Sequence, residues 1–214
     1  MALIKKHNAT QNNDKYGLSE VPGHPGLYQI VALRDFKIQD VDGHLNRREK
    51  QIKKGTMGGR VSGYHNLSQH GKCWIEDGAL VADNALVEGN ALVGGRSLVT
   101  NNSLIGGNAM VLANAAISDN VSISNNAIVG NRCIISGRAE VSGDAMVWGA
   151  VKITDDAVVT DHASLNGRVQ VTGEAVVDGQ AFVSGFVKLK NDVHVGGTAH
   201  LEGSGVYSKE EILD

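Results

Sequence analysis

The residues of this chain best suited to acid–base chemistry are its histidines and the carboxylates near them. His162 directly follows Asp161 and lies 18 residues after Asp144. A histidine oriented by a carboxylate can act as a general base, taking a proton from an attacking hydroxyl or amine. We therefore select His162 as the candidate catalytic base, with Asp144 or Asp161 as the residue that orients it. The alternative is a polar surface position that accepts histidine as readily as asparagine.

The other histidines and the cysteines give weaker indications of a catalytic or binding role. His194 and His200 fall on outward-facing positions, and the segment HNLSQHG (65–71) has a structural or a functional role that the sequence leaves open. Cys73 and Cys133 lack CxxC or other ligand spacing, which argues against a disulfide framework and against a metal site. We interpret both cysteines as small core residues.

Composition restricts the class of protein. The chain has 214 residues with 27 Gly, 2 Pro and only 4% aromatic residues, a glycine content that disfavours helical bundles. Neither the apolar run of a signal peptide nor an apolar segment of membrane-spanning length occurs in the sequence. These features predict a cytoplasmic protein without a membrane partner.

A six-residue repeat must position the candidate residues. From Gly71 to Glu202 the sequence divides into 22 consecutive hexads without insertion or deletion. The fifth position is always Ile, Val or Leu, and the third is always Ala, Ser, Val or Cys. The first is Gly, Asn or Asp except at Ala113. A period of six is typical of a hexapeptide parallel β-helix.

Each hexad position has a physical role. Positions three and five lie on one face of a strand and must point inward, whereas position four points outward. Positions one and two must turn a corner, where Gly, Asn and Asp accept a positive φ most readily. Three hexads then form a triangular coil of 18 residues, which gives about seven coils. The corner column Asn84, Asn102 and Asn120 predicts a ladder of stacked amides.

The segments outside the hexads predict caps. Residues 1–25 form a polar, mobile tail in this interpretation, and residues 26–70 a small β cap with a basic hairpin around an Asp-Gly turn. Residues 71–202 form the β-helix and 203–214 a C-terminal cap. Ser208 and Glu211, at capping-box spacing, predict a short closing helix in that cap.

The hexads resemble those of left-handed parallel β-helix proteins, in which an aliphatic residue precedes a small one by four positions. Val81 with Ala85, Val87 with Ala91 and Ile135 with Ala139 follow this pattern. The left hand of the coil is implied by the resemblance. The fold class predicted is therefore all-β, a left-handed parallel β-helix with a small N-terminal β cap.

A closer resemblance is carried by the Gly-Thr-x-Gly-Gly turn at 55–59, by NLSQ at 66–69 and by CWI at 73–75. Residues 27–90 are similar to the start of YdcK-type hexapeptide proteins of enterobacteria, and a phage or prophage relative is a further interpretation. The family is usually catalogued as acetyltransferases. The resemblance implies acetyl- or acyl-CoA bound between neighbouring prisms, a histidine base, and a loop extruded from one coil. The unbroken hexads leave no room for such a loop, which argues against an enzyme and for no cofactor.

One outward column is apolar over most of its length and predicts a protein–protein interface. We expect a homo-dimer or homo-trimer packed along this stripe, with an unidentified protein as a further partner. The alternative is that the aliphatic residues reflect strand propensity alone. The interface residues predicted are Leu92, Met110, Leu112, Ile128, Met146, Trp148 and Phe182.

The N-terminal part is basic where the repeat is acidic. Residues 1–60 carry 11 Lys/Arg and 6 Asp/Glu, a net charge of +5, whereas residues 61–214 carry 9 and 17, a net charge of −8. A basic patch could bind an acidic partner, but a nucleic-acid motif and interleaved aromatics are lacking, which argues against nucleic acid. A solvated hairpin face is the alternative. The patch predicted is Arg47, Arg48, Lys50, Lys53, Lys54 and Arg60.

Three functions follow from the sequence. The first is a non-catalytic, oligomeric scaffold that presents rigid β-helical faces to a partner. The second is a CoA-dependent acyltransferase that uses His162 or a cap histidine across a subunit boundary. The third is a structural component of a phage particle.

Overall fold

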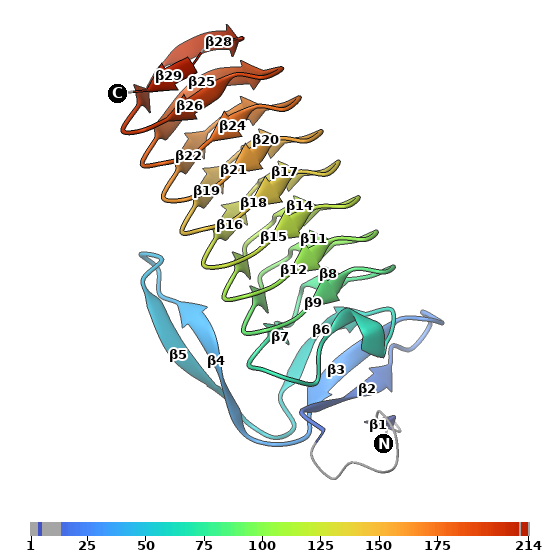
Figure 1. Ribbon diagram of the computed structural model, residues 1–214. Coiled ribbons are helices and arrows are strands. Elements are labelled where there is room, and N and C mark those ends of the chain that lie inside the picture. The colour runs from blue at the N-terminus through green and yellow to red at the C-terminus, as the bar shows by residue number, and fades with distance from the viewer. Residues whose placement is uncertain (1–3, 6–13, 210, 214) are drawn as a thin grey trace.

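The molecule is a triangular prism of stacked coils with a β cap and a separate hairpin at its N-terminal end (Figure 1). The computed structural model describes residues 4–5, 14–209 and 211–213. Between the two ends of the prism, each short strand pairs in parallel with the strand 18 residues further along the chain, as Leu92 does with Met110. The structure confirms the predicted fold class, an all-β, left-handed parallel β-helix of hexapeptide repeats.

Three faces make up the prism. The face that carries the apolar column, called the stripe face below, consists of β7 (Trp74–Ile75), β10 (Leu92–Val93), β13 (Met110–Val111), β16 (Ile128–Asn131), β19 (Met146–Gly149), β22 (Ser164–Gly167), the first half of β25 (Phe182–Lys190) and β27 (His200–Leu201). The prism is about eight coils high, because strands at the C-terminus add one more strand to each of the other two faces.

The second and third faces are built in the same way. The second face contains β8 (Leu80–Val81), β11 (Leu98–Val99), β14 (Ala116–Ile117), β17 (Ile134–Ile135), β20 (Lys152–Ile153), β23 (Gln170–Val171), the second half of β25 and β28 (Ser204–Ser208). The third face contains β9 (Leu86–Val87), β12 (Leu104–Ile105), β15 (Ser122–Ile123), β18 (Glu140–Val141), β21 (Val158–Val159), β24 (Val176–Val177), β26 (His194–Gly196) and β29 (Glu211–Leu213).

Hexad positions three and five fill the interior, as predicted. Every third-position side chain is buried, and so is every fifth-position side chain except Leu201 in the last coil. A small residue beside an aliphatic one fits the narrow triangular section, which larger pairs would overfill. Cys73 and Cys133 are both fully buried at third positions, so the interpretation of the cysteines as small core residues agrees with the structure.

The corners explain the first position of the hexad. Residues there have positive φ in every hexad but the second, where Gly78 takes that conformation instead of Asp77. Several first-position aspartates also accept a hydrogen bond from the next corner, such as Asp119 from the Gly137 amide at 3.0 Å. The predicted amide ladder is present, because Asn84 donates to Asn102 at 3.1 Å and Asn102 to Asn120 at 3.0 Å.

The N-terminal cap is an antiparallel sheet that runs into the prism. It contains β1 (Ile4–Lys5), β2 (Tyr16–Glu20), β3 (Tyr28–Ala32) and β6 (Met57–Val61), followed by the short 3₁₀ helix η1 (Tyr64–Asn66). Strand β6 pairs in parallel with β8, so the cap sheet continues the second face. The residues that pair there, Val61 and Val81, are 20 positions apart, because the first turn is two residues longer than the later coils.

The prediction of a mobile tail over residues 1–25 is wrong for the described residues from 14 onward. Tyr16–Glu20 is a strand paired with β3, and Lys15 and Tyr16 are fully buried. The Gln69 side chain accepts a hydrogen bond from the Lys15 amide at 2.9 Å and donates one to the Tyr16 carbonyl at 3.0 Å. Specific pairing by one glutamine therefore orders a segment whose composition is polar. Residues 1–3 and 6–13 lie outside the described residues.

The hairpin predicted around Asp42-Gly43 is present. Strands β4 (Phe36–Val41) and β5 (Arg47–Ile52) pair with each other as a separate two-stranded sheet. The Asp42 carboxylate accepts hydrogen bonds from the His44 and Asn46 amides, which close the turn. The hairpin extends along the prism from the cap towards the middle coils (Figure 1).

The prediction of a closing helix at the C-terminus is wrong. Ser204–Ser208 and Glu211–Leu213 are the strands β28 and β29, which pair with β25 and β26. Parallel pairing with the preceding coil satisfies these backbone groups more completely than an isolated turn of helix would.

Candidate functional site

The lower part of the apolar stripe is covered by the hairpin of the same chain. We define the lower stripe as Trp74, Leu92, Met110 and Ile128, whose exposed fractions are 1%, 1%, 0% and 6%. The prediction that Leu92, Met110 and Ile128 lie on a solvent-exposed interface is therefore wrong. Leu112, beside them, is half-buried and packs against the same core.

The hairpin contributes the apolar side of this contact. Phe36 packs its ring edge-on against Trp74 with 5.3 Å between centroids, and Ile38 and Ile52 are 1% and 3% exposed. A two-stranded hairpin is at best marginally stable alone in water, so it needs such a face. Its six-residue strands span about 20 Å, enough to cover four coils spaced about 4.8 Å apart.

Polar contacts fix the hairpin on the prism. Lys50 pairs with Glu76 at 2.5 Å, and Lys72 of the first coil pairs with Glu49 at 3.1 Å. Near the hairpin tip, the Arg47 guanidinium donates to the Asn108 carbonyl at 2.9 Å and to the Asn126 carbonyl at 2.5 Å. Burial lowers the pKa of Arg47, and the nearby Asp144 carboxylate opposes this.

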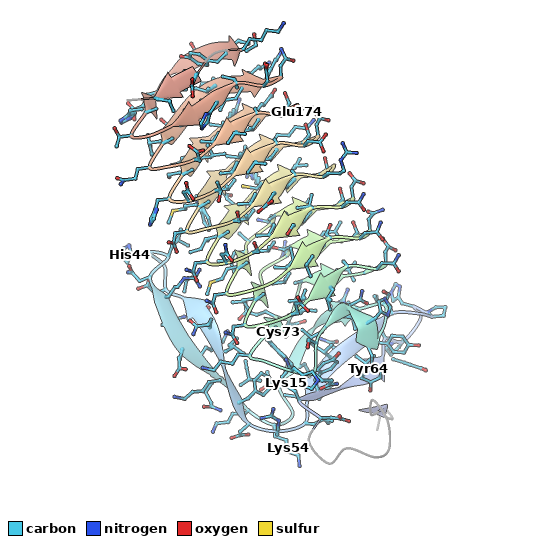
Figure 2. The ribbon with its side chains drawn as sticks, in the orientation of Figure 1. Lys15, His44, Lys54, Tyr64, Cys73 and Glu174 are labelled. Carbon is cyan, nitrogen blue, oxygen red and sulfur yellow. The ribbon has the colours of Figure 1, made fainter. Side chains whose placement is uncertain are left out.

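These contacts divide the predicted basic patch. Arg47 and Lys50 bind the prism. Arg48 pairs with Asp40 at 2.8 Å within the hairpin, and Lys53 pairs with Asp35 at 3.0 Å at its base. Lys54 and Arg60 are exposed, and within the described part of the chain neither has an ion pair. Figure 2 places Lys54 at the base of the hairpin and His44 at its tip. The six residues therefore do not form one continuous patch open to solvent.

The upper part of the stripe lies beyond the hairpin tip. We define the upper stripe as Met146, Trp148 and Phe182; Met146 is 37% exposed and the other two are half-buried. Trp148 lies over Gly130 so closely that a Cβ there would overlap the indole ring. Phe182 packs edge-on against His200 with 4.8 Å between ring centroids. The upper stripe is the part of the predicted interface that remains accessible.

A ladder of polar side chains runs along the corner next to the stripe face. Asn90 donates to Asn108 at 2.9 Å, Asn108 to Asn126 at 3.0 Å and Asn126 to Asp144 at 2.8 Å. The next member is His162, whose Nε2 lies 3.4 Å from Asp144 Oδ2. The ladder thus holds the carboxylate that faces the histidine.

The structure selects between the two carboxylates proposed to orient His162. Asp144 faces the ring, whereas the Asp161 carboxylate accepts a hydrogen bond from the Gly179 amide at 3.2 Å in its own corner. The side chains of His162 and Asp144 are 69% and 51% exposed, so water surrounds the pair. In this open setting the pair can transfer protons, but the protein provides little desolvation to strengthen the interaction.

Three other histidines have structural contacts. His194 Nε2 lies 2.9 Å from Asp178 and its Nδ1 lies 3.7 Å from Glu211, joining successive coils of the third face. His200 pairs with Glu202 at 3.1 Å. In the cap, His65 Nε2 contacts the Asp83 carbonyl at 2.6 Å.

The HNLSQHG segment joins the cap to the first coils. The Asn66 amide donates to the Asp83 carbonyl at 3.0 Å and to the Ala85 carbonyl at 2.8 Å, and Gln69 binds the N-terminal strand as described above. These amide contacts stabilise the fold, because a buried backbone carbonyl without a hydrogen bond would lower the free energy of unfolding. A structural role therefore explains Asn66 and Gln69.

A lysine and a cysteine meet under the first coil, where Figure 2 labels both. Lys15 Nζ lies 3.2 Å from Cys73 Sγ and donates to the Cys73 carbonyl at 2.9 Å. Burial lowers the pKa of Lys15 and raises that of Cys73. Burial also raises the pKa of Cys133 to about 11. Neither thiol has the exposure of a nucleophile.

Among residues 4–5, 14–209 and 211–213, no group of three or more His, Cys, Asp or Glu side chains is arranged to hold a metal ion. The same residues include no helix with the length and apolarity needed to span a bilayer.

Comparisons with known proteins concern the fold. Neither a family model nor a curated protein matches the sequence. Among solved structures, the UDP-N-acetylglucosamine O-acyltransferase LpxA of Moraxella catarrhalis RH4 is similar at 16% identity and a TM-score of 0.31, over 64% of this chain and 68% of that chain. LpxA of Acinetobacter baumannii is similar at 12% identity and a TM-score of 0.30, over 67% and 71%. At these values the likeness says nothing about activity.

Proposed function

We propose that this chain is a non-catalytic β-helical scaffold that binds a protein through the upper stripe. The observation that carries the proposal is the contrast along one face. The lower stripe is buried under the chain's own hairpin, while Met146, at 37%, remains exposed on the same column. Unbroken coils make that face rigid, so little conformational entropy is lost on binding.

The predicted homo-dimer or homo-trimer stays a prediction, now restricted to the upper stripe and tested separately from an unlike partner. Met146→Lys should abolish self-association because it places a charge in the centre of the contact. Light scattering on both proteins measures this, with Ile134→Lys on the second face, where Ile134 is 50% exposed, as the matched control. Self-association is supported if the wild type and Ile134→Lys both have masses above that of the 22.6 kDa monomer while Met146→Lys does not. A monomeric wild type would exclude it and leave an unlike partner.

The second candidate is a CoA-dependent acyltransferase, favoured by the 3.4 Å approach of Asp144 to His162. In that function His162 would accept a proton from the acceptor hydroxyl or amine, and Asp144 would orient the ring. The resemblance of residues 27–90 to YdcK-type proteins supports it, as their usual label is acetyltransferase. A phage-particle component stays a prediction that co-purification with particles would test.

Titration with acetyl-CoA separates the enzyme from the scaffold. For a scaffold we expect neither heat nor a thermal shift at millimolar ligand. An acyltransferase would show saturable binding, and ligand at 100 times its dissociation constant would add about 2.7 kcal/mol of stability. If His162→Ala still binds acetyl-CoA but no longer transfers the acyl group, His162 is assigned as the base. If the variant transfers the acyl group as the wild type does, His162 is not the base.

A further inference from the structure

We infer that the upper stripe binds a basic, amphipathic β-hairpin of a partner protein, in the way that the lower stripe binds the chain's own hairpin. The inference rests on the proposed scaffold function and specifies the chemistry of its partner. Three observations carry it: the contact already made within the chain, the acceptors repeated along the corner, and the charge of the prism.

The chain's own hairpin shows what this surface accepts. Its apolar side chains, Phe36, Ile38 and Ile52, face the prism at the lower stripe. Its cations bind the margins, Lys50 at Glu76 and Arg47 at the corner. Above the hairpin tip the same column continues with Met146, Ser164 and Phe182, so the upper stripe offers a smaller apolar surface with one hydroxyl in it.

The corner repeats the acceptors that bind Arg47. The carbonyls of Asn108 and Asn126, both at the second hexad position, receive the Arg47 guanidinium. The equivalent carbonyls of Asp144 and His162 lie in the next two coils, and within the described part of the chain they accept no hydrogen bond. A second guanidinium therefore has the same pair of acceptors available, because the corner geometry repeats every 18 residues.

Charge favours a basic occupant over a second copy of the prism. The Asp144 carboxylate is 51% exposed beside this corner, and the prism portion, residues 61–214, has 9 Lys/Arg against 17 Asp/Glu. A second copy placed with the same corner in contact would bring two exposed Asp144 carboxylates together, which is unfavourable. The hairpin of one molecule cannot bind the upper stripe of a second molecule while it covers the lower stripe of its own prism. A partner hairpin with arginine at its tip meets both requirements.

The probe for this surface is the hairpin sequence itself, supplied in trans. A fluorescent peptide of residues 36–52, cyclised through its ends, is titrated against the full chain and followed by anisotropy. We expect saturable binding that weakens about tenfold or more in Met146→Lys and with an Arg47→Ala peptide. Ile134→Lys on the second face should bind as the wild type does. Asp144→Asn, which retains the contact with Asn126, gives a second variant in case Met146→Lys folds poorly, and it should also weaken binding.

A control separates the upper stripe from displacement of the resident hairpin. In the full-length Arg47→Ala variant the resident hairpin is held less firmly, so displacement would increase peptide binding, whereas binding at the upper stripe would stay unchanged. Absence of saturable binding, or binding unaffected by both Met146→Lys and Asp144→Asn, would overturn the inference. A wild-type dimer that Met146→Lys dissociates, without peptide binding, would assign the surface to a second copy; the scaffold function would then stand while this inference fell.

Discussion

At the scale of single residues, the corner conformation governs what the repeat tolerates. Nearly every first-position residue has positive φ, which costs an L-residue with a Cβ about 1–2 kcal/mol unless it is Asn or Asp. Ala113 adopts a φ of 61° without the side-chain hydrogen bonds that help those two residues. It is therefore a local weakness in an otherwise optimised column.

The first prediction concerns this weakness. Ala113→Gly should raise the free energy of unfolding by about 0.5–1 kcal/mol, because glycine adopts the corner conformation without penalty. Gly107→Ala, in the neighbouring hexad at the same φ of 61°, should lower it by about 1–2 kcal/mol. Urea denaturation of the three proteins measures both changes. A loss of stability in Ala113→Gly would contradict the account.

A second residue-scale prediction concerns pH. The Cys133 thiol has its pKa raised by burial from 9.0 to about 11. Between these values the unfolded chain loses its proton first, so the native state loses stability as pH rises through that window. A two-unit shift corresponds to about 2–3 kcal/mol.

Cys133→Ala provides the comparison, because alanine occupies most third positions of the repeat. The wild type should lose about 2–3 kcal/mol more than the variant between pH 8 and pH 11. Denaturation curves across this range measure the difference, and all other titrating groups are common to both proteins. Parallel stability profiles would show that the thiol ionises as freely in the folded chain as in the unfolded one.

At the scale of elements, the hairpin is the part of the fold that depends most on tertiary contact. Among the described residues, strands β4 and β5 pair only with each other, so side chains attach them to the prism. The base is held by Phe36 against Trp74 and the tip by Arg47 at the corner. The tip contact is the more exposed of the two and should open first.

Arg47→Ala therefore tests the hairpin as an element. We expect faster hydrogen exchange over residues 36–52, stronger binding of a hydrophobic dye, and a loss of about 1–3 kcal/mol, the range for hydrogen bonds from a charged donor. Arg48→Ala is the matched control, because Arg48 pairs with Asp40 inside the hairpin and its side chain is 58% exposed. Equal exchange in both variants would mean that the corner carbonyls do not hold the tip.

At the scale of the whole molecule, the sequence predicts the prism well because its rule is local. Each hexad specifies an inward pair and a corner, so the class of residue at positions one, three and five determines the coil without reference to distant contacts. The same logic located His162 beside Asp144, since residues 18 apart in the same column must stack.

The parts that were predicted wrongly depend on long-range contacts. Outward positions accept almost any side chain, so the pattern could not show that Leu92 is covered by residues of the hairpin. The alternation of Phe36 and Ile38, together with the opposite charges of cap and prism, was the available signal. The order of Tyr16 depends on Gln69, and strand pairing at the C-terminus overrides the capping-box spacing of Ser208 and Glu211.

The repeated corner has a consequence for the position at which a bound hairpin lies along the prism. Equivalent carbonyls recur at about 4.8 Å along the corner, so each coil offers a guanidinium the same backbone acceptors as the coil below it. Arg47 could bridge Asn126 and Asp144 as readily as Asn108 and Asn126 if the guanidinium alone set the position. The position of the hairpin along the prism is fixed at its base, where it contacts Trp74 and Glu76, which the later coils do not repeat. Any segment that binds higher on the prism without such an anchor will be free to shift by whole coils.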